Sequence, residues 1–321
     1  MARPRIACTG PLDSVARDIL EGYGDVVTAD SNTEEALLPL LEGIVALVVR
    51  GDGVANARII AAAKDLKVIG RTGAGYENVD IAAATARRIP VVYTPGANSR
   101  AVAEGAMALM LALCKNLAGW DRQLKRGDWK ARFRSNPRDL EGATLGIVGF
   151  GRIGRSLAEL ARPFGMTLLA FDPYASPETA RRLGVRLTGI DELMREADVI
   201  SIHAALTPES KGLIDRRRLS LVKPGSYLLN LARGGIVESH DALHDALVRG
   251  TLAGVGLDVF DPEPPDVSHP IFSLPNCLTS PHVHGMTAGA MRRIWTSMAE
   301  DVCAVLDGRR PRFTVNPEVF G

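Results

Sequence analysis

Short β-rich runs alternate with alanine- and leucine-rich stretches at helical spacing along the whole 321-residue chain. Apolar strands separated by helices are typical of parallel βαβ units, in which helices cover both faces of a sheet. A long helical pattern, residues 101–125, separates the alternation into two series. The predicted strands of the first series are 5–8, 25–28, 46–49, 67–70 and 90–93, and those of the second are 144–148, 167–171, 199–203, 227–231, 254–259 and 277–280.

This organisation predicts an α/β protein with two doubly wound parallel-sheet domains, because the chain is too long for one ordinary core. The second series predicts a Rossmann domain over residues 99–286, and the first a smaller flavodoxin-like domain over residues 1–98. The final helix, 287–306, follows a completed series, so residues 287–321 are expected to return to the smaller domain. A polar stretch, 126–138, looks like a connector that packs against something, such as a second subunit.

Composition excludes several classes of protein. The formal net charge is +1, from 38 basic and 37 acidic residues, which gives no basic excess for nucleic-acid binding. The four cysteines are scattered without C-x-x-C spacing, so neither a disulfide framework nor a zinc site is indicated. No apolar run approaches the roughly 20 residues that span a bilayer, and the N-terminus lacks the apolar core of a signal peptide. We therefore expect a cytoplasmic protein with no membrane partner.

A glycine motif follows the first strand of the second series and opens a helix. Its residues are Gly149, Phe150, Gly151, Arg152, Ile153 and Gly154. In this context G-x-G-x-x-G predicts a dinucleotide site, because the glycines allow a tight turn, approach of the pyrophosphate and close helix packing. Asp172, followed by Pro173, ends the next strand about 20 residues on, where a carboxylate accepts hydrogen bonds from the adenosine ribose. A carboxylate there repels a 2′-phosphate, which favours NAD over NADP.

Three further segments lie at strand ends, on the edge where such folds bind ligands. Residues 230–235 contain Arg233, residues 256–264 contain Glu263, and residues 280–282 end in His282. The three segments offer a guanidinium, a carboxylate and an imidazole.

In the order of these motifs the sequence resembles the D-isomer-specific 2-hydroxyacid dehydrogenases, which include phosphoglycerate, glyoxylate/hydroxypyruvate and D-lactate dehydrogenases. The matching residues are Gly73-Ala74-Gly75 with Asn78-Val79-Asp80, Asn98 with Val102-Ala103-Glu104, the glycine motif, Asn230 to Gly235, Asp258-Val259 and Pro281-His282. The resemblance covers nearly the whole chain. It implies hydride transfer between NAD and a small 2-hydroxy or 2-keto acid, with Arg233, Glu263 and His282 as the catalytic set.

The chemistry of that reaction suits these residue types. Reduction of a keto acid requires a proton at the carbonyl oxygen, and histidine supplies one near neutral pH. Glu263, hydrogen-bonded to the far ring nitrogen, would favour the imidazolium. Arg233 could hold carboxylate and carbonyl oxygens in a bidentate fork and polarise the carbonyl. Keto-acid reduction should then be favoured at lower pH.

The resemblance also implies contacts outside the catalytic set. Further candidates for cofactor binding are His203, Thr207, Ala232 and Asp258, although Ala205 stands where the family usually has proline. Candidates for substrate binding are Arg50, Arg71, Gly73, Ala74, Gly75 and Asn98, with backbone N–H groups of the glycine loop receiving the substrate carboxylate. Arg50, Arg71 and Arg100 either contact a distal anionic group or face solvent. A homodimer, with residues 101–138 as its arm, is a further implication.

Several alternatives stay open. Asp261 rivals Glu263 as the partner of His282, and His284 stands where the family usually has a small residue. A metal site at His282 and His284, or at His240 and His244, lacks an evident further ligand, so no metal is expected. The main functional alternative is a non-catalytic, NAD(H)-sensing, corepressor-like binding protein. A dehydrogenase for formate or an inorganic oxyanion is another. The substrate itself, with glyoxylate, hydroxypyruvate and 3-phosphoglycerate as candidates, is not decided by the sequence.

Overall fold

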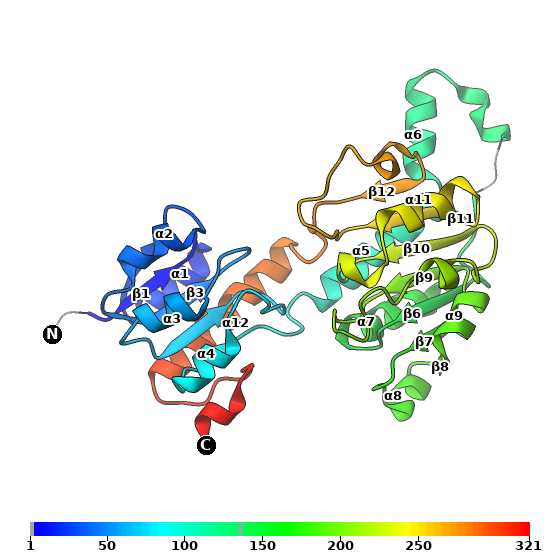
Figure 1. The fold of residues 1–321 in the computed structure, drawn as a ribbon. Coiled ribbons are helices and arrows are strands. Elements are labelled where there is room, and N and C mark those ends of the chain that lie inside the picture. Colours follow the sequence, from blue (N-terminus) through cyan, green and yellow to red (C-terminus); the bar gives the residue numbers. More distant parts are fainter. Residues whose placement is uncertain (1–2, 135–136) are drawn as a thin grey trace. The chain divides into compact units, whose positions relative to one another are not determined.

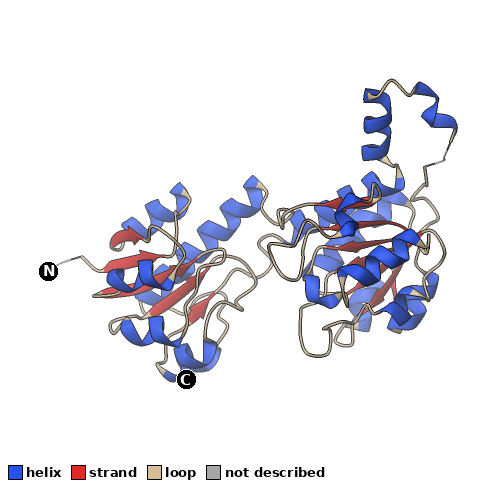
Figure 2. Cartoon of the chain, turned by 45° about the horizontal axis from the view of Figure 1, so that its top comes forward, coloured by secondary structure: helices blue, strands red, loops and turns tan. Residues whose placement is uncertain are grey.

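The computed structural model describes residues 3–134 and 137–321, which form two compact units. The first unit runs to Asn98 and resumes at Met286, and the second covers Ser99–Gly285 (Figure 1). The chain returns to the first unit one residue before the expected boundary. Each unit is a parallel sheet with helices on both faces (Figure 2), so the predicted fold class is confirmed.

The first unit has a five-stranded sheet in the order β2-β1-β3-β4-β5. Its strands are β1 (Arg5–Cys8), β2 (Asp25–Thr28), β3 (Ile44–Val49), β4 (Val68–Arg71) and β5 (Val91–Val92). Its helices are α1 (Ser14–Glu21), α2 (Glu34–Leu37), α3 (Ala57–Ala62), α4 (Ile81–Ala86) and α12 (Ala288–Leu306), with 3-10 turns η1 (Leu38–Leu40) and η6 (Pro317–Phe320). Asp13, Asn56, Asp80 and Thr287 cap helix N-termini through their side chains, which accounts for where those helices begin.

The C-terminal helix α12 completes the core of the first unit. With α1 it covers one sheet face through Trp295, Met298 and Val302, while α2, α3 and α4 cover the other. Gly70 of β4 permits the close contact, because a Cβ there would lie 2.6 Å from Val302 Cγ2. Beyond α12, the buried Asn316 side chain accepts from Val91 N and donates to Ile89 O, which ties the tail to β5.

The second unit has a seven-stranded sheet in the order β12-β11-β10-β9-β6-β7-β8. Its strands are β6 (Thr144–Val148), β7 (Thr167–Phe171), β8 (Val185–Leu187), β9 (Val199–Ile202), β10 (Ser226–Asn230), β11 (Leu252–Leu257) and β12 (Cys277–Thr279). The expectation of six strands was wrong, because it missed β8. This strand has only three residues and pairs with β7 alone, so it leaves no apolar run in the sequence.

Two layers of helices cover this sheet. Helices α5 (Ser99–Cys114), α7 (Arg152–Ala161) and α8 (Pro177–Arg182) pack on one face, and α9 (Ile190–Glu196), α10 (Arg216–Leu219) and α11 (His240–Val248) pack on the other. The 3-10 turns are η2 (Trp129–Phe133), η3 (Arg162–Phe164), η4 (Gly234–Ile236) and η5 (Pro270–Ser273). Together these elements hold the carboxyl ends of the central strands in fixed positions.

The single helix expected over residues 101–125 was wrong. It is two helices, α5 and α6 (Leu117–Lys125), broken at Asn116, whose φ of 50° lies in the left-handed region that asparagine tolerates. Among the described residues no single helix is long and apolar enough to cross a membrane. Helices α5 and α6 are bent by 53° relative to each other, and they reach the length and apolar content of a membrane span only when the two are counted together.

Candidate active site

The turn between β6 and α7 is shaped by its glycines. Gly149 has a φ of +94°, and a Cβ there would collide with the backbone of Ala204. A Cβ on Gly154 would collide with Gly149 O, whereas one on Gly151 would meet nothing within 4 Å. Gly151 is therefore the open position of the turn. Gly151 is also the N-cap residue of α7, and no side chain caps this end of the helix. The backbone N–H groups of Arg152 and Ile153, the first two residues of α7, are therefore available to an anion. This cradle fits a pyrophosphate.

Asp172 follows β7 and braces the same turn. Its carboxylate accepts hydrogen bonds from Phe150 N and Tyr174 N, both at 2.8 Å. Pro173 separates Asp172 from Tyr174 in the sequence. Each carboxylate oxygen retains a lone pair, so the group can still accept from ribose hydroxyls.

Replacing Asp172 with asparagine should relax discrimination against NADPH. The amide keeps an acceptor for one backbone N–H but no longer repels a 2′-phosphate, so the NADPH/NADH ratio of kcat/KM should rise about tenfold. Steady-state kinetics with both cofactors measures this ratio. Glu159→Gln, which removes a charge from the exposed side of α7, is the matched control, and an equal change there would contradict the assignment.

His203 lies buried where β9 ends. Its Nε2 is 2.8 Å from Ser201 Oγ, and its Nδ1 has no hydrogen-bond partner in the described part of the chain. Burial lowers the pKa of His203 to about 3, so the ring is neutral. Thr207 is exposed and bonds to Ser210 within its own turn. Because the backbone at 203–204 packs on Gly149, this loop borders the glycine turn.

Asn230 shapes the loop that carries Arg233. Its Oδ1 accepts from Ala232 N at 3.1 Å, and its Nδ2 donates to Arg233 O at 3.0 Å. Arg233 Nη1 donates to Ala232 O at 2.8 Å. Gly234 then allows close packing on the next loop, since a Cβ there would collide with the Phe260 backbone. The sequence pointed to Arg233 but not to these supports.

Glu263 and His282 are in direct contact. Glu263 Oε2 lies 2.9 Å from His282 Nδ1, and Glu263 Oε1 accepts from Phe260 N at 3.0 Å. Both side chains are partly exposed, so the pair contributes little to stability and acts mainly to orient the ring. Between the two carboxylates that the sequence left open, the structure places Glu263, and not Asp261, against the imidazole.

Asp258 holds the turn on which His282 stands. Its Oδ1 accepts from Ser280 Oγ at 2.7 Å and from Val283 N at 3.0 Å, while Oδ2 accepts from His284 N at 3.2 Å. These bonds stabilise the left-handed backbone of His282, at φ 55°. Asp258, expected to bind the cofactor, here holds the turn that carries His282. Ser280 was missed because a serine after a strand carries no distinctive signal.

His284 packs against helix α5. A Cβ on Gly105 would lie 2.5 Å from the His284 ring, so the glycine makes room for it. His284 Nε2 is buried and has no hydrogen-bond partner among residues 3–134 and 137–321.

The predicted substrate contacts lie in or beside the first unit. Gly73, at φ +107°, donates its N–H to Thr94 Oγ1 at 2.9 Å, and it begins the loop that continues through Ala74 and Gly75. Arg71 bonds to its own loop, with Nε 3.0 Å from Asn78 Oδ1. Asn98 directly precedes α5, and Arg50 follows β3.

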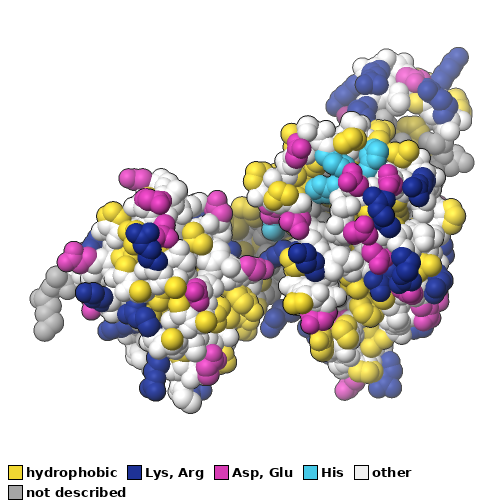
Figure 3. Space-filling view, in the orientation of Figure 1, with side chains coloured by type: hydrophobic (Ala, Val, Ile, Leu, Met, Phe, Trp, Pro, Cys, Tyr) yellow, Lys and Arg dark blue, Asp and Glu magenta, His cyan; other side chains and the backbone are white. Residues whose placement is uncertain are grey.

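A histidine cluster lies over α11, as Figure 3 shows. The rings of His240 and His244 are 5.6 and 6.2 Å from that of His269. His269 Nδ1 accepts from Ile271 N at 3.2 Å, and its Nε2 is 3.1 Å from Asp241 Oδ1, so both nitrogens are engaged. Burial, followed by the nearby His269, lowers the pKa of His240. Within the described ranges no group of three or more His, Cys, Asp or Glu could hold a metal ion.

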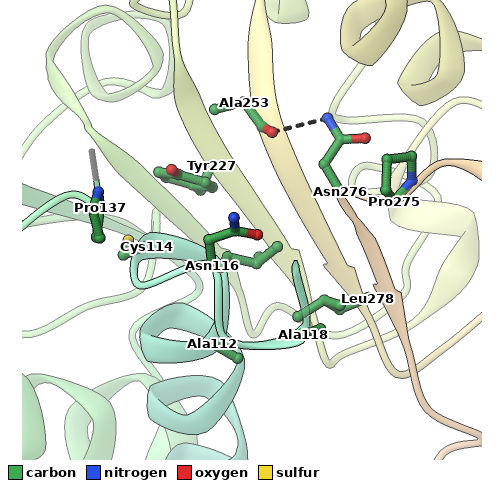
Figure 4. Close-up of a pocket in the computed structure, with 11 residues that line it drawn as sticks. Ala112, Cys114, Asn116, Ala118, Pro137, Tyr227, Ala253, Pro275, Asn276 and Leu278 are labelled. Carbon is green, nitrogen blue, oxygen red and sulfur yellow. Dashed lines mark hydrogen bonds between the residues drawn. The ribbon is translucent and has the colours of Figure 1, made fainter. Parts of the chain in front are cut away.

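A pocket of about 190 Å³ lies near the C-terminus of α5 (Figure 4). Tyr227 and Ala253, which line it, stand near the amino ends of β10 and β11. Gly149, Arg233 and Asp258 instead follow the carboxyl ends of their strands. The pocket therefore lies away from the candidate site and contains none of its residues.

Residues 107–284 match the family model described as D-isomer specific 2-hydroxyacid dehydrogenase, NAD binding domain. The chain belongs to the D-isomer specific 2-hydroxyacid dehydrogenase family. The match lies within the second unit, which confirms that unit as the NAD-binding domain and NAD as the cofactor.

Relatives of known name cover most of the chain. It is 38% identical over 305 residues to a hydroxypyruvate reductase of Thermotoga maritima, covering 94% of this chain and 98% of that protein. It is 40% identical over 313 residues to a D-3-phosphoglycerate dehydrogenase of Methanocaldococcus jannaschii, covering 97% of this chain but 59% of the relative's length. The TT0316 protein from Thermus thermophilus is similar in structure, with a TM-score of 0.89, 37% identity, and coverage of 97% of this chain and 99% of that chain.

Proposed function

We propose that this protein is an NAD-dependent dehydrogenase that interconverts a small D-2-hydroxy acid and its 2-keto acid. The observation that carries the proposal is the contact of Glu263 Oε2 with His282 Nδ1 at 2.9 Å, next to a loop that presents Arg233. An imidazole with a carboxylate at one nitrogen and its other nitrogen directed to a substrate is suited to general acid–base catalysis. Family membership supports the same reaction class.

The turn 149–154 and Asp172 would hold the dinucleotide, which in its reduced form would supply the hydride for the carbonyl carbon of the substrate. His282 Nε2 gives its proton to the carbonyl oxygen, and Glu263 stabilises the imidazolium before that transfer. Arg233 holds the carboxylate and carbonyl oxygens and stabilises the charge that develops on the latter. In oxidation, neutral His282 removes the hydroxyl proton. In the first unit, Ala74 and Gly75 offer their backbone N–H groups to a substrate carboxylate, because the N–H of Gly73 is already donated to Thr94 Oγ1. Arg50, Arg71 and Asn98 are the further substrate contacts that we propose for this unit.

We further propose a cytoplasmic homodimer. The arm, residues 101–138, carries large apolar side chains that the single chain leaves in solvent: Trp129 is 62% exposed and Phe133 76% exposed. Arg132 stacks on both rings, at 4.6 and 4.7 Å from their centroids. Burial of such side chains against a second copy would stabilise the pair. Ser135 and Asn136 of the arm lie outside the described residues.

Oxidation of NADH, followed by its absorbance, tests the reaction class. The panel is glyoxylate, hydroxypyruvate, pyruvate, 3-phosphohydroxypyruvate, sulfopyruvate and oxaloacetate, each also with NADPH. Turnover that prefers NADH supports the proposal. Tight NADH binding without turnover of any of these acids would instead favour the non-catalytic, corepressor-like binding protein.

Replacing Glu263 with glutamine should slow reduction of the keto acid. The amide can still contact His282 Nδ1, but it supplies no negative charge beside the ring that is to give up the proton. We therefore expect kcat for reduction to fall about tenfold while KM stays nearly unchanged. Steady-state kinetics with NADH and the preferred keto acid measures both constants. A variant with the kcat of the wild type would assign Glu263 no electrostatic role.

A further inference from the structure

One face of helix α5 lies along strand β11, where leucines of the helix contact glycines of the strand. A Cβ on Gly254 would lie 3.0 Å from Leu113 Cδ2. Two residues further along the strand, a Cβ on Gly256 would lie 3.2 Å from Leu109 Cδ1. Residues two apart in a strand share a face, as do residues four apart in a helix. The helix and the strand are therefore held side by side in a fixed register.

The next position in this register is occupied differently. Gly105 comes four residues before Leu109, and Asp258 comes two residues after Gly256. Here the helix has the glycine, and the large side chain is that of His284, whose N–H is donated to Asp258 Oδ2 at 3.2 Å. A Cβ on Gly105 would lie 2.5 Å from Cγ and Nδ1 of the His284 ring. The ring therefore fills the space that a side chain at position 105 would need.

The contact of the His284 ring with α5 depends on the shape of the ring. His284 Nε2 is buried and has no hydrogen-bond partner in the described part of the chain. A buried nitrogen without a partner carries the cost of its lost hydration and adds no bond in return. The ring is thus held against Gly105 by packing, and an apolar side chain of similar volume could take its place.

The turn that His284 anchors to α5 also carries His282. The side chain of Asp258 accepts from the N–H groups of Val283 and His284, which ties the two residues after His282 to the end of β11. His282 has a φ of 55°, a conformation that a residue with a side chain keeps only where its surroundings hold it. A shift of the backbone at 283–284 would therefore change the direction of the imidazole relative to Glu263.

We propose that His284 is a positioning residue for His282. Its ring, seated on Gly105, sets the distance between α5 and the turn that carries the acid/base imidazole. The inference rests on the proposed function and adds to it a residue that acts through His282 without touching the substrate. Gly105, His282 and His284 all belong to the second unit.

The test begins with Gly105→Ala, whose added methyl group must displace the ring. We expect kcat for keto-acid reduction to fall about tenfold, because a small misplacement of a catalytic group is costly, while KM and the Kd for NADH change less than about twofold. His284→Ala should also lower kcat. Combining the two substitutions places the methyl group in the space that the ring leaves, so the double variant should be faster than Gly105→Ala alone.

Two further variants separate positioning from a merely structural role. His284→Leu keeps a similar volume without a ring nitrogen and should retain kcat within about twofold of the wild type. Gly289→Ala is the matched control, since it also adds a methyl group to a helical glycine, but its nearest neighbour would be the flexible end of Arg293, at 3.4 Å. A structural role alone would lower the unfolding temperature and leave kcat per folded molecule unchanged.

The outcomes separate this inference from the proposed function. If His284→Ala reduces the keto acid with the kcat of the wild type, the positioning role is wrong while the dehydrogenase function stands. This variant only removes atoms from a partly buried side chain, so it decides the question even if Gly105→Ala does not fold. A His284→Leu variant as slow as His284→Ala would also overturn the role of ring shape. Absence of turnover by the wild type overturns the function and, with it, the inference.

Discussion

Replacing His282 with alanine is expected to lower kcat for keto-acid reduction by about 10²–10⁴-fold, because the carbonyl oxygen then has no positioned proton donor. The imidazole is partly exposed and contacts Glu263, while the backbone turn that carries it is held by Asp258. Removal of the ring should therefore leave the fold intact. Single-turnover kinetics measure the loss, and fluorescence titration with NADH checks that cofactor binding is retained.

The matched control for His282 is His244→Ala, which removes an imidazole from α11 without touching the candidate site. It should retain activity within about twofold of the wild type. If His282→Ala kept more than a tenth of wild-type kcat at neutral pH, another group would have to donate the proton, and the role proposed for His282 would be wrong.

Replacing Arg233 with lysine should lower kcat/KM by about 10²–10³-fold. Lysine keeps the positive charge but cannot form the planar fork that binds carboxylate and carbonyl oxygens together. A lost donor at the developing oxyanion has a cost of about 3–4 kcal/mol. Because the fork both binds and polarises the substrate, we expect KM to rise and kcat to fall. Steady-state kinetics with the preferred keto acid separates the two effects.

Arg217→Lys provides the comparison for Arg233. Arg217 makes a bidentate ion pair with Asp191 at the surface, so its replacement should leave kcat/KM within about twofold of the wild type. A rise in KM alone for Arg233→Lys would limit Arg233 to holding the substrate and leave polarisation of the carbonyl to another group.

Sequence periodicity predicted most of the fold because each long strand is buried on both faces. The bounds of β1, β2, β6 and β7 agree with the predicted runs to the residue. It failed at β8, whose edge position requires few apolar residues. It also failed at Asn116, where one residue in a left-handed conformation breaks an otherwise continuous helical pattern.

For the candidate site as well, the sequence predicted some features and missed others. Arg233, Glu263 and His282 could be named from motif order, but the sequence could not decide between Asp261 and Glu263 as the partner of the imidazole. That choice depends on the path of the loop, which Phe260 N fixes by donating to Glu263. The role of Arg71 was likewise hidden, because its contact with Gly51 joins two loops 20 residues apart.

The first unit is made from both ends of the sequence, and this sets the order in which the protein can be completed during synthesis. Every residue of the second unit has been added before Met286, so its seven-stranded sheet can close while the chain is still growing. All strands of the five-stranded sheet are synthesised before the second unit begins. The face of that sheet that receives Trp295 and Met298 nevertheless stays uncovered until α12 has been made. The part translated first is thus the part finished last, and for that interval its apolar face is open to chaperones, proteases and other unfinished chains.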